Sequence, residues 1–352
     1  MNLEYSLQEQ VSIAAADRKP LNITAGNTKS FLGRTPRGDA LDVSGHRGIL
    51  SYEPKELVIT ARGGTPLKEL EAALAEQGQM LPFEPPYFGA NATLGGTIAA
   101  GLSGPRRPYT GSARDFVLGV RLLNGKGEIL RFGGEVMKNV AGYDLSRLMT
   151  GAMGTLGVIL DVSLKVLPLP AREITLVSCS DSASAIKRFN ELASRPLPLS
   201  AAACDAEHAY IRLSGAQTAV DAARKTLGGD LLDENDNFWQ QHIREQGHAF
   251  FQGQAPLWRL SLPPGAPGVS FQGKCLIDWG GALRWVRSDN EPREIFRAVA
   301  QVGGHATLFR NGERNGQVYQ PLPAALMTIH KRLKQAFDPQ GLFNPGRLYE
   351  EL

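Results

Sequence analysis

The stretch that decides the fold reads Lys138-Asn-Val-Ala-Gly-Tyr-Asp-Leu-Ser-Arg-Leu-Met-Thr-Gly-Ala-Met-Gly-Thr-Leu-Gly-Val-Ile-Leu-Asp-Val-Ser-Leu164. Asp144 is a suitable N-cap for a short helix over 145–149, which Gly151 would end. The apolar, β-branched run 158–164 predicts a buried strand. Because glycine has no Cβ, the glycines at 151, 154 and 157 let the backbone approach a flat ligand closely. The alternative is an ordinary loop packed under a sheet.

Two further segments of small residues precede this stretch. A predicted strand over 20–24 runs into Ala25-Gly26-Asn27-Thr28-Lys29-Ser30, a polar turn whose main-chain N–H groups can hold a pyrophosphate. The second segment is Thr93-Leu94-Gly95-Gly96-Thr97-Ile98-Ala99-Ala100-Gly101, and a turn over 109–115 with Ser112 and Arg114 follows it. No Gly-x-Gly-x-x-Gly follows a predicted strand, so a Rossmann dinucleotide site is not expected. The first half therefore predicts three glycine-rich, backbone-lined sites.

Hydrophobic periodicity predicts the remaining elements of the first half. A helix is expected over 3–16, and short strands over 41–43 and 57–60. Thr65 and Pro66 are expected to begin a helix whose apolar face consists of Leu67, Leu70, Ala73 and Leu74. A hairpin is predicted with strands over 116–123 and 128–132.

The character of the chain changes after Pro168-Leu169-Pro170, so a domain boundary is expected near residue 171. The second half begins with the order of a split β-α-β-β-α-β unit. Its strands are expected over 174–178, 199–204, 210–213 and near 231, and its helices over 182–193 and 216–227. Two more helices are predicted, over 291–302 and 322–337.

Composition and charge limit the class of protein. The 352 residues suffice for two domains, and 42% hydrophobic with 21% charged residues is typical of a globular protein. A net charge of +3 gives no electrostatic case for a nucleic-acid partner. The cysteines at 179, 204 and 275 are far apart, so no metal or iron–sulfur site is expected. The uncharged residues from 85 to 105 are rich in glycine, which argues against a transmembrane segment, and no signal peptide is expected.

Taken in order, the three glycine-rich segments resemble the FAD-binding domain of the vanillyl-alcohol-oxidase (PCMH-type) flavoproteins, over residues 18–170. Lys138-Asn-Val-Ala-Gly-Tyr-Asp-Leu, Gly154-Thr-Leu-Gly-Val-Ile and Asp338-Pro-Gln-Gly-Leu-Phe-Asn-Pro-Gly346 resemble the lactate and glycolate dehydrogenase branch. Over nearly its whole length, the chain resembles the E subunits of bacterial glycolate oxidases. The segments that carry this narrower resemblance are Arg106-Arg107-Pro108, Phe132-Gly-Gly-Glu-Val-Met-Lys-Asn139 and Asp278-Trp-Gly-Gly-Ala-Leu-Arg-Trp285.

The resemblance implies an α+β fold. A PCMH-type FAD-binding domain is expected over 1–171, and a ferredoxin-like α+β cap domain over 172–352, whose terminal segment returns to the flavin domain. FAD is expected to bind without a covalent link, because neither 25–30 nor 93–101 contains the histidine or cysteine that tethers the flavin in some relatives. The implied FAD-binding residues are Gly26, Asn27, Thr28, Lys29, Ser30, Thr93, Leu94, Gly95, Gly96, Ile98, Gly101, Ser112, Arg114, Gly154, Gly157, Val158 and Ile159.

The resemblance also implies oxidation of glycolate to glyoxylate in a complex with two partners, a catalytic flavin-containing D subunit and an iron–sulfur F subunit. The complex would lie in the cytoplasm or peripherally at the inner membrane. No catalytic base is assigned, because the segment Gly303–Gly312 holds one histidine, His305, where the catalytic subunits have two. Arg114 and Arg310 are candidate cations for a substrate carboxylate. Two alternatives stay open: a non-redox structural subunit with a vestigial flavin site, and a self-sufficient FAD-dependent 2-hydroxy-acid dehydrogenase.

The chain also departs from the family pattern at three positions. Met153 stands where the branch usually has a glutamate, and Asn27 and Lys29 replace glycines of the phosphate loop. Cofactor binding is therefore better supported by the sequence than independent catalysis.

Overall fold

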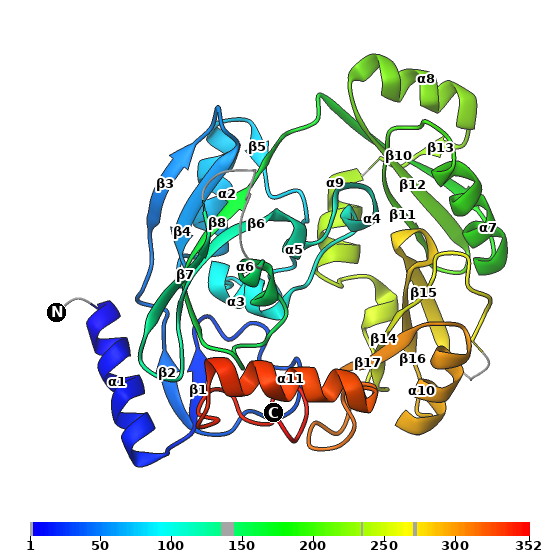
Figure 1. Cartoon of the computed structure of the whole chain (residues 1–352). Coiled ribbons are helices and arrows are strands. Elements are labelled where there is room, and N and C mark those ends of the chain that lie inside the picture. The colour runs from blue at the N-terminus through cyan, green and yellow to red at the C-terminus, as the bar shows by residue number, and fades with distance from the viewer. Residues whose placement is uncertain (1–2, 135–143, 234, 270–272) are drawn as a thin grey trace.

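A computed structural model describes residues 3–134, 144–233, 235–269 and 273–352. Residues 138–143 of the opening stretch, and 135–139 of the segment that begins at Phe132, lie outside the described part of the chain. The fold is α+β, as expected, and is built on two large antiparallel sheets (Figure 1). One sheet uses strands from the first half of the chain, and the other uses strands from the second half.

The five-stranded sheet has the order β3-β4-β8-β6-β7. The run predicted as a buried strand is β8 (Val158–Lys165), which lies in the centre and is buried over seven of its eight residues. The neighbouring strands are β3 (Ile49–Glu53), β4 (Val58–Arg62), β6 (Val117–Leu123) and β7 (Ile129–Gly133). Leucines of α2 (Leu67–Glu76) and Ile98 of α3 (Leu94–Ala100) join these strands in one hydrophobic core.

A smaller parallel pair holds the two chain ends together. It consists of β1 (Leu21–Thr24) and β2 (Asp39–Asp42). Phe343 forms a parallel bridge to Leu21, and the Leu21 N–H donates to the Leu342 carbonyl at 2.7 Å. Helix α1 (Leu3–Asp17) packs Leu7 and Val11 into the same cluster. The C-terminal segment therefore lies against the N-terminal sheet, although more than 300 residues separate the two in sequence.

The eight-stranded sheet has the order β13-β10-β12-β11-β15-β16-β14-β17. Its first four strands follow the 4-1-3-2 order of a ferredoxin-like unit, which confirms the split β-α-β-β-α-β prediction. They are β10 (Arg172–Cys179), β11 (Leu199–Cys204), β12 (His208–Gly215) and β13 (Asp230–Leu231). Helices α7 (Ser182–Ala193) and α8 (Gln217–Leu227) contribute Phe189 and Val220 to the core on one face.

The other four strands extend the same sheet. They are β14 (Leu257–Ser261), β15 (Lys274–Asp278), β16 (Leu283–Arg287) and β17 (His305–Arg310), with α10 (Pro292–Gln301) packed on them. A π-helix covers Phe238–Arg244. Figure 1 shows α11 (Ala324–Phe337) along one edge of the molecule, between β1 and β17. The remaining elements are β5 (Gln79–Met80), β9 (Leu167–Pro168), α4 (Arg107–Thr110), α5 (Ala113–Phe116), α6 (Leu145–Leu148), α9 (Asn235–Asn237) and two 3-10 turns, Ala249–Phe251 and Trp279–Gly281.

Several local predictions differ from the structure. Strand β3 was not predicted, because its residues alternate weakly and none of them is buried. Thr65 does not cap α2: its hydroxyl instead bonds the Gly48 backbone, and Pro66 takes the N-cap position. The second glycine-rich segment contains helix α3, and the turn over 109–115 contains parts of α4 and α5. Short helices rich in glycine carry too little apolar periodicity to be recognised from sequence.

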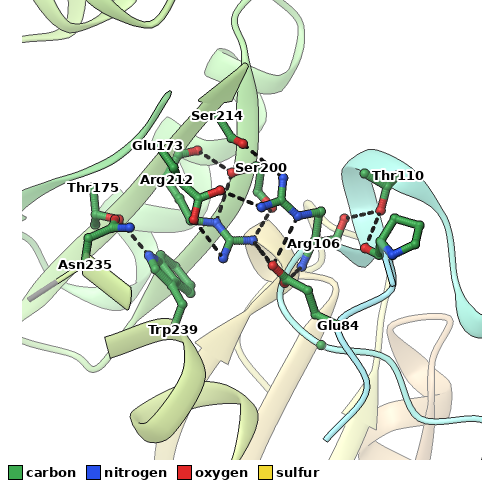
Figure 2. A network of polar contacts seen from close by, with 12 residues as sticks. Glu84, Arg106, Thr110, Glu173, Thr175, Ser200, Arg212, Ser214, Asn235 and Trp239 are labelled. Carbon is green, nitrogen blue, oxygen red and sulfur yellow. Dashed lines mark hydrogen bonds and ion pairs between the residues drawn. The ribbon is translucent and has the colours of Figure 1, made fainter. Parts of the chain in front are cut away.

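A largely buried network of two carboxylates and two guanidiniums joins the connecting segment 84–106 to the eight-stranded sheet (Figure 2). Glu84, which precedes α3, accepts from Arg106 Nε at 3.1 Å and from Arg212 of β12 at 2.8 and 3.0 Å. Arg106 in turn donates to Glu173 of β10 at 2.5 Å. Burial alone would raise the pKa of Glu84, but Arg212 and Arg106 outweigh it and hold that pKa below its usual value. The two carboxylates and the two guanidiniums therefore neutralise one another where the N-terminal half meets the eight-stranded sheet.

Glu84→Gln should destabilise the protein strongly, because it leaves the Arg212 guanidinium buried with an incomplete set of counter-ions. Loss of one partner of a buried ion pair costs about 3–5 kcal/mol. A urea titration should show a clearly lower midpoint for this variant than for the wild type. The matched control is Glu351→Gln, which breaks an exposed pair with Lys331 and should leave the midpoint unchanged. Equal midpoints for the two variants would contradict the stabilising role of the network.

Candidate functional site

A large open cavity lies where the N-terminal sheet, α3 and the C-terminal segment meet. Its empty volume, including the part that is open to solvent, is about 920 Å³. Four parts of the chain line it: the end of β1 with the turn after it, the start of α3, the glycine-rich loop before β8, and the C-terminal segment. The lining residues are Asn22, Ile23, Thr24, Ala25, Gly26, Asn27, Thr28, Lys29, Ser30, Pro36, Val43, Thr93, Gly95, Gly96, Ala99, Ala100, Met153, Gly154, Gly157, Ile159, Asn344 and Arg347.

Eleven of the residues expected to bind FAD line this one cavity. They come from all three glycine-rich segments: Gly26, Asn27, Thr28, Lys29, Ser30, Thr93, Gly95, Gly96, Gly154, Gly157 and Ile159. The other six do not line it. Leu94, Ile98 and Val158 are buried in hydrophobic clusters, and Gly101 caps α3. Ser112 forms a capping box with Asp115 at α5, and Arg114 is exposed on that helix.

The turn after β1 presents main-chain N–H groups. Among the described residues, none accepts a hydrogen bond from the backbone N–H of Gly26, Asn27, Thr28 or Lys29. Asn27 adopts a φ of 55°, in the left-handed region that asparagine tolerates, so its replacement of a glycine is compatible with the turn. A Cβ at Gly26 would lie 1.6 Å from the Asn91 carbonyl oxygen, which makes glycine obligatory there. Such a turn with unsatisfied N–H groups is suited to a phosphate anion.

Lys29 adds a positive charge beside these N–H groups. Its Nζ donates to the Tyr87 carbonyl at 3.2 Å. Burial lowers the pKa of Lys29 to about 8, and the nearby Glu245 only partly opposes this. A bound anion would favour the charged lysine. Arg347 has a different role, because it donates to the carbonyls of Arg34 and Ser30 at 2.8 and 2.9 Å and so fixes the end of the turn.

The start of α3 leaves room that the protein itself does not use. Thr93 is the N-cap, and its hydroxyl accepts from the Gly96 N–H at 3.3 Å. A Cβ on Gly96 would meet only Thr93 Oγ1, at 3.1 Å, whereas a Cβ on Gly95 would lie 2.9 Å from the Gly63 carbonyl oxygen. Gly95 is therefore required for internal packing. Gly96 is not, although glycine inside a helix is unfavourable, so a bound molecule is the better explanation for it.

Asn344 and Met153 are cavity residues that sequence reasoning did not assign. The Asn344 side chain accepts from the Ile23 N–H at 2.8 Å and donates to the Met153 carbonyl at 2.7 Å. Met153 has a φ of 52°, which is strained for a methionine. A Cβ on Gly154 would lie 2.6 Å from Asn344 Nδ2. Asn344 belongs to the terminal motif 338–346, so that motif was the available signal for it.

The candidate catalytic groups are not gathered at this cavity. No histidine or cysteine lines it among the described residues. His305 begins β17 and is exposed. Arg310 stacks over the rings of Phe31 and Phe88, 4.3 and 4.6 Å from their centroids. The cavity thus combines phosphate-binding features with close backbone approach, and its described lining offers neither a catalytic base nor a side chain for covalent flavin attachment.

No helix in the described part of the chain has the length and hydrophobicity needed to cross a membrane.

A family model described as an FAD binding domain matches residues 4–133. Among solved structures, p-cresol methylhydroxylase with substrate bound superposes with a TM-score of 0.70 at 18% identity. That superposition covers 97% of this chain and 86% of the other, so the PCMH-type fold is shared. The open main-chain N–H groups of the turn after β1 are compatible with this family match.

Two curated relatives bear on the family. The glycolate oxidase subunit GlcD of Bacillus subtilis (strain 168) is 33% identical over 137 residues, 39% of this chain and 29% of that protein. The glycolate oxidase subunit GlcE of Escherichia coli (strain K12) is 52% identical over 351 residues, 99% of each chain. Similarity at this level over the full length of both proteins shows common family membership. The chain belongs to the family of the glycolate oxidase subunit GlcE, and its N-terminal part contains an FAD binding domain.

Proposed function

We propose that this protein is the FAD-binding E subunit of a multi-subunit glycolate oxidase that converts glycolate to glyoxylate. The observation that carries the proposal is the single cavity shared by the three glycine-rich segments, in a chain 52% identical to GlcE. Bound FAD would supply the acceptance of two electrons, and the residues of this chain would hold and orient it.

Each wall of the cavity is assigned a part of FAD. The N–H groups of Gly26 to Lys29, with the Lys29 ammonium, are proposed to hold the pyrophosphate, which is supported by their lack of acceptors among the described residues. Gly96 is proposed to allow close approach of the ribityl chain and the flavin ring. Gly154, Gly157 and Ile159 would line the opposite side. The proposal retains Ser112 and Arg114 only as contacts at the periphery.

The proposal includes the domain division expected from sequence, with the FAD-binding domain over 1–171 and the cap domain over 172–352. It also includes two partners, a catalytic flavin-containing D subunit and an iron–sulfur F subunit. The relative named GlcD supports the first partner, and the second follows from the resemblance alone. The complex would be cytoplasmic or attached peripherally to the inner membrane through its subunits.

A second candidate function is a structural subunit that keeps the fold but binds no flavin. The differences at Asn27, Lys29 and Met153 favour it, because they replace residues usual in the dehydrogenase branch. The absorption spectrum of the purified chain separates the two: the E-subunit proposal expects a yellow protein, and the structural alternative a colourless one.

Gly96→Val should yield folded protein with little bound FAD. An added Cβ at Gly96 would meet only Thr93 Oγ1, and Gly96 is exposed, so a valine there is expected to occupy ligand space without disturbing the core. The flavin-to-protein absorbance ratio after purification measures occupancy, and circular dichroism checks the fold. The control is Gly265→Val, at an exposed glycine that has open space around it. Full flavin occupancy in Gly96→Val would show that the flavin site has been misplaced.

Acid precipitation should release all of the flavin into the supernatant. The described cavity lining has no histidine or cysteine to form a covalent bond with the ring. The absorbance of supernatant and pellet after precipitation gives the result directly. Flavin colour that stays with the precipitated protein would rule out non-covalent binding.

The isolated chain should not oxidise glycolate at a useful rate. Removal of hydride from a 2-hydroxy acid needs a base near the hydroxyl group, and the described cavity lining provides none. Dye-coupled turnover should therefore appear only when the D and F subunits are co-expressed, compared at equal flavin content. If the isolated chain matches the complex, the accessory-subunit proposal is wrong, and His305 becomes the first residue to mutate.

A further inference from the structure

Lys29 extends from the cavity that the three glycine-rich segments line, here called the glycine-lined cavity, toward the segment 84–88. It lines that cavity at a position where the family pattern has a glycine. Its Nζ donates to the Tyr87 carbonyl at 3.2 Å. An ammonium group has three donors, so this bond leaves two for a bound anion. Lys29 can therefore contact a ligand of the cavity and the segment 84–88 at the same time.

Glu245 holds the same segment from the opposite side. It directly follows the π-helix Phe238–Arg244, and its carboxylate accepts from the Tyr87 N–H at 2.9 and 3.2 Å and from the Phe88 N–H at 2.8 Å. The Tyr87 carbonyl and the Phe88 N–H belong to one peptide group, and in a trans peptide they point in opposite directions. A cation and an anion therefore hold this peptide group from its two ends, and each bond polarises the other.

The backbone of the segment 84–88 is strained, so its position depends on the contacts around it. Glu84 has a φ of 45° and Phe88 a φ of 51°, both in the left-handed region that side chains other than glycine rarely adopt. Such a backbone persists only where surrounding contacts determine it. The ion pairs of Glu84 fix one end of the segment, and Lys29 and Glu245 fix the other. Of these residues, Lys29 is the one that lines the glycine-lined cavity.

Lys29 lies among groups of both signs, and its own charge changes near pH 8. Burial lowers the pKa of Lys29 to about 8, and Glu245 opposes this shift. The Tyr87 hydroxyl donates to Glu71 of α2 at 2.5 Å, and burial raises the pKa of both groups. Three arginines also face the segment or the turn: Arg244, paired with Glu245 at 3.2 Å, Arg310, stacked over Phe31 and Phe88, and Arg347, bonded to the Ser30 carbonyl. A bound anion would raise the pKa of Lys29 and keep it charged.

We propose that Lys29 is a positioning residue that couples occupancy of the glycine-lined cavity to the docking of the segment 84–88 on the π-helix. A bound anion favours the ammonium form of Lys29, and that form holds the Tyr87 carbonyl with a charge-assisted bond while Glu245 holds the N–H of the same peptide group. Coupling of this kind is reciprocal, so the docked segment also strengthens anion binding. The inference rests on the proposed function only in taking FAD, with its pyrophosphate, as the anion.

The affinity for FAD should fall as the pH rises past 8. The anion-bound lysine has the higher pKa, so binding takes up a proton, and the gain in affinity is present below the ligand-free pKa of about 8 and is lost above it. Titration of the apoprotein with FAD should show a Kd that rises by up to about tenfold from pH 7 to pH 9. Calorimetry at pH 8 in two buffers of different ionisation enthalpy should show the uptake of up to about half a proton per FAD. A flat profile without proton uptake would overturn the proposal.

Substitutions of Lys29 test whether its charge carries the effect. Lys29→Met should weaken FAD binding about tenfold at pH 7 and make the affinity independent of pH, because the charged hydrogen-bonding partner is lost. Lys29→Arg stays charged at every pH tested, so it should bind FAD more tightly than Lys29→Met does, with no fall at pH 9. The control Lys55→Met removes an exposed lysine between β3 and β4 and should keep the wild-type profile. A pH-dependent affinity in Lys29→Met would contradict the role of Lys29.

Glu245→Gln tests the link to the π-helix. Glutamine keeps an oxygen that can accept from the peptide N–H groups, but it removes the negative charge that raises the pKa of Lys29. The fall in FAD affinity should therefore move to lower pH, and in a Lys29→Met background the same substitution should leave the affinity unchanged. The control Glu56→Gln alters an exposed carboxylate and should leave the profile in place. An unshifted profile in Glu245→Gln would show that Lys29 and the π-helix act independently.

Hydrogen exchange measures the docking itself. Residues 84–88 do not line the glycine-lined cavity, so slower exchange there reports coupling rather than direct contact with the ligand. FAD should slow exchange of the Tyr87 and Phe88 amides in the wild-type protein but not in Lys29→Met. ADP, which has a pyrophosphate but no flavin, separates the two proposals. A chain that binds ADP with the expected pH profile but does not bind FAD refutes the proposed function alone. A chain that binds FAD with equal exchange in both proteins refutes this inference alone, and binding of neither ligand refutes both.

Discussion

The structure depends on the buried contact between Glu84 and Arg212. Glu84 belongs to the segment that leads into α3, and Arg212 lies in the middle of β12, so this ion pair ties that segment of the N-terminal half to the eight-stranded sheet. A buried charge pair tolerates little displacement, because each partner loses its solvation and depends on the geometry of the other. The same contact acts on Asp278 of β15: burial raises the pKa of its carboxyl group, Glu84 raises it further, and Arg212 lowers it.

The sequence predicted the elements whose pattern is local. The run 158–164 is apolar and β-branched without interruption, and it became the central strand β8. The ferredoxin-like unit was predictable because its two helices and three of its strands carry clear periodicity, and the order of elements restricts the topology. Strand β3 and helix α3 were not predicted, and neither were strands β14 to β17. The first exposes residues on both faces, and the second consists of small residues whose helical form depends on the Thr93 cap and on packing against β8.

The site residues also divide into those that the sequence could predict and those that it could not. Glycines that approach a ligand are visible in a sequence, because no other residue type fits such positions, and most of the expected glycines line one cavity. Side chains that were assigned only because they are next to those glycines in sequence do not line the cavity. Leu94, Ile98 and Val158 lie on the buried sides of α3 and β8, and the facing of a short helix is hard to infer from its sequence.

The position of Asn344 determines when the glycine-lined cavity is completed during synthesis of the chain. Its side chain contacts the backbone at Ile23 and at Met153, so one wall of the glycine-lined cavity is supplied by a residue 321 positions after the strand that it supports. A growing chain on the ribosome has the glycine-rich turns long before it has this residue. The cavity is therefore complete only after translation has passed the terminal motif, so a ligand of this cavity meets its whole binding site only then. Truncation or fusion near residue 344 would disturb a site whose other parts are encoded in the first half of the gene.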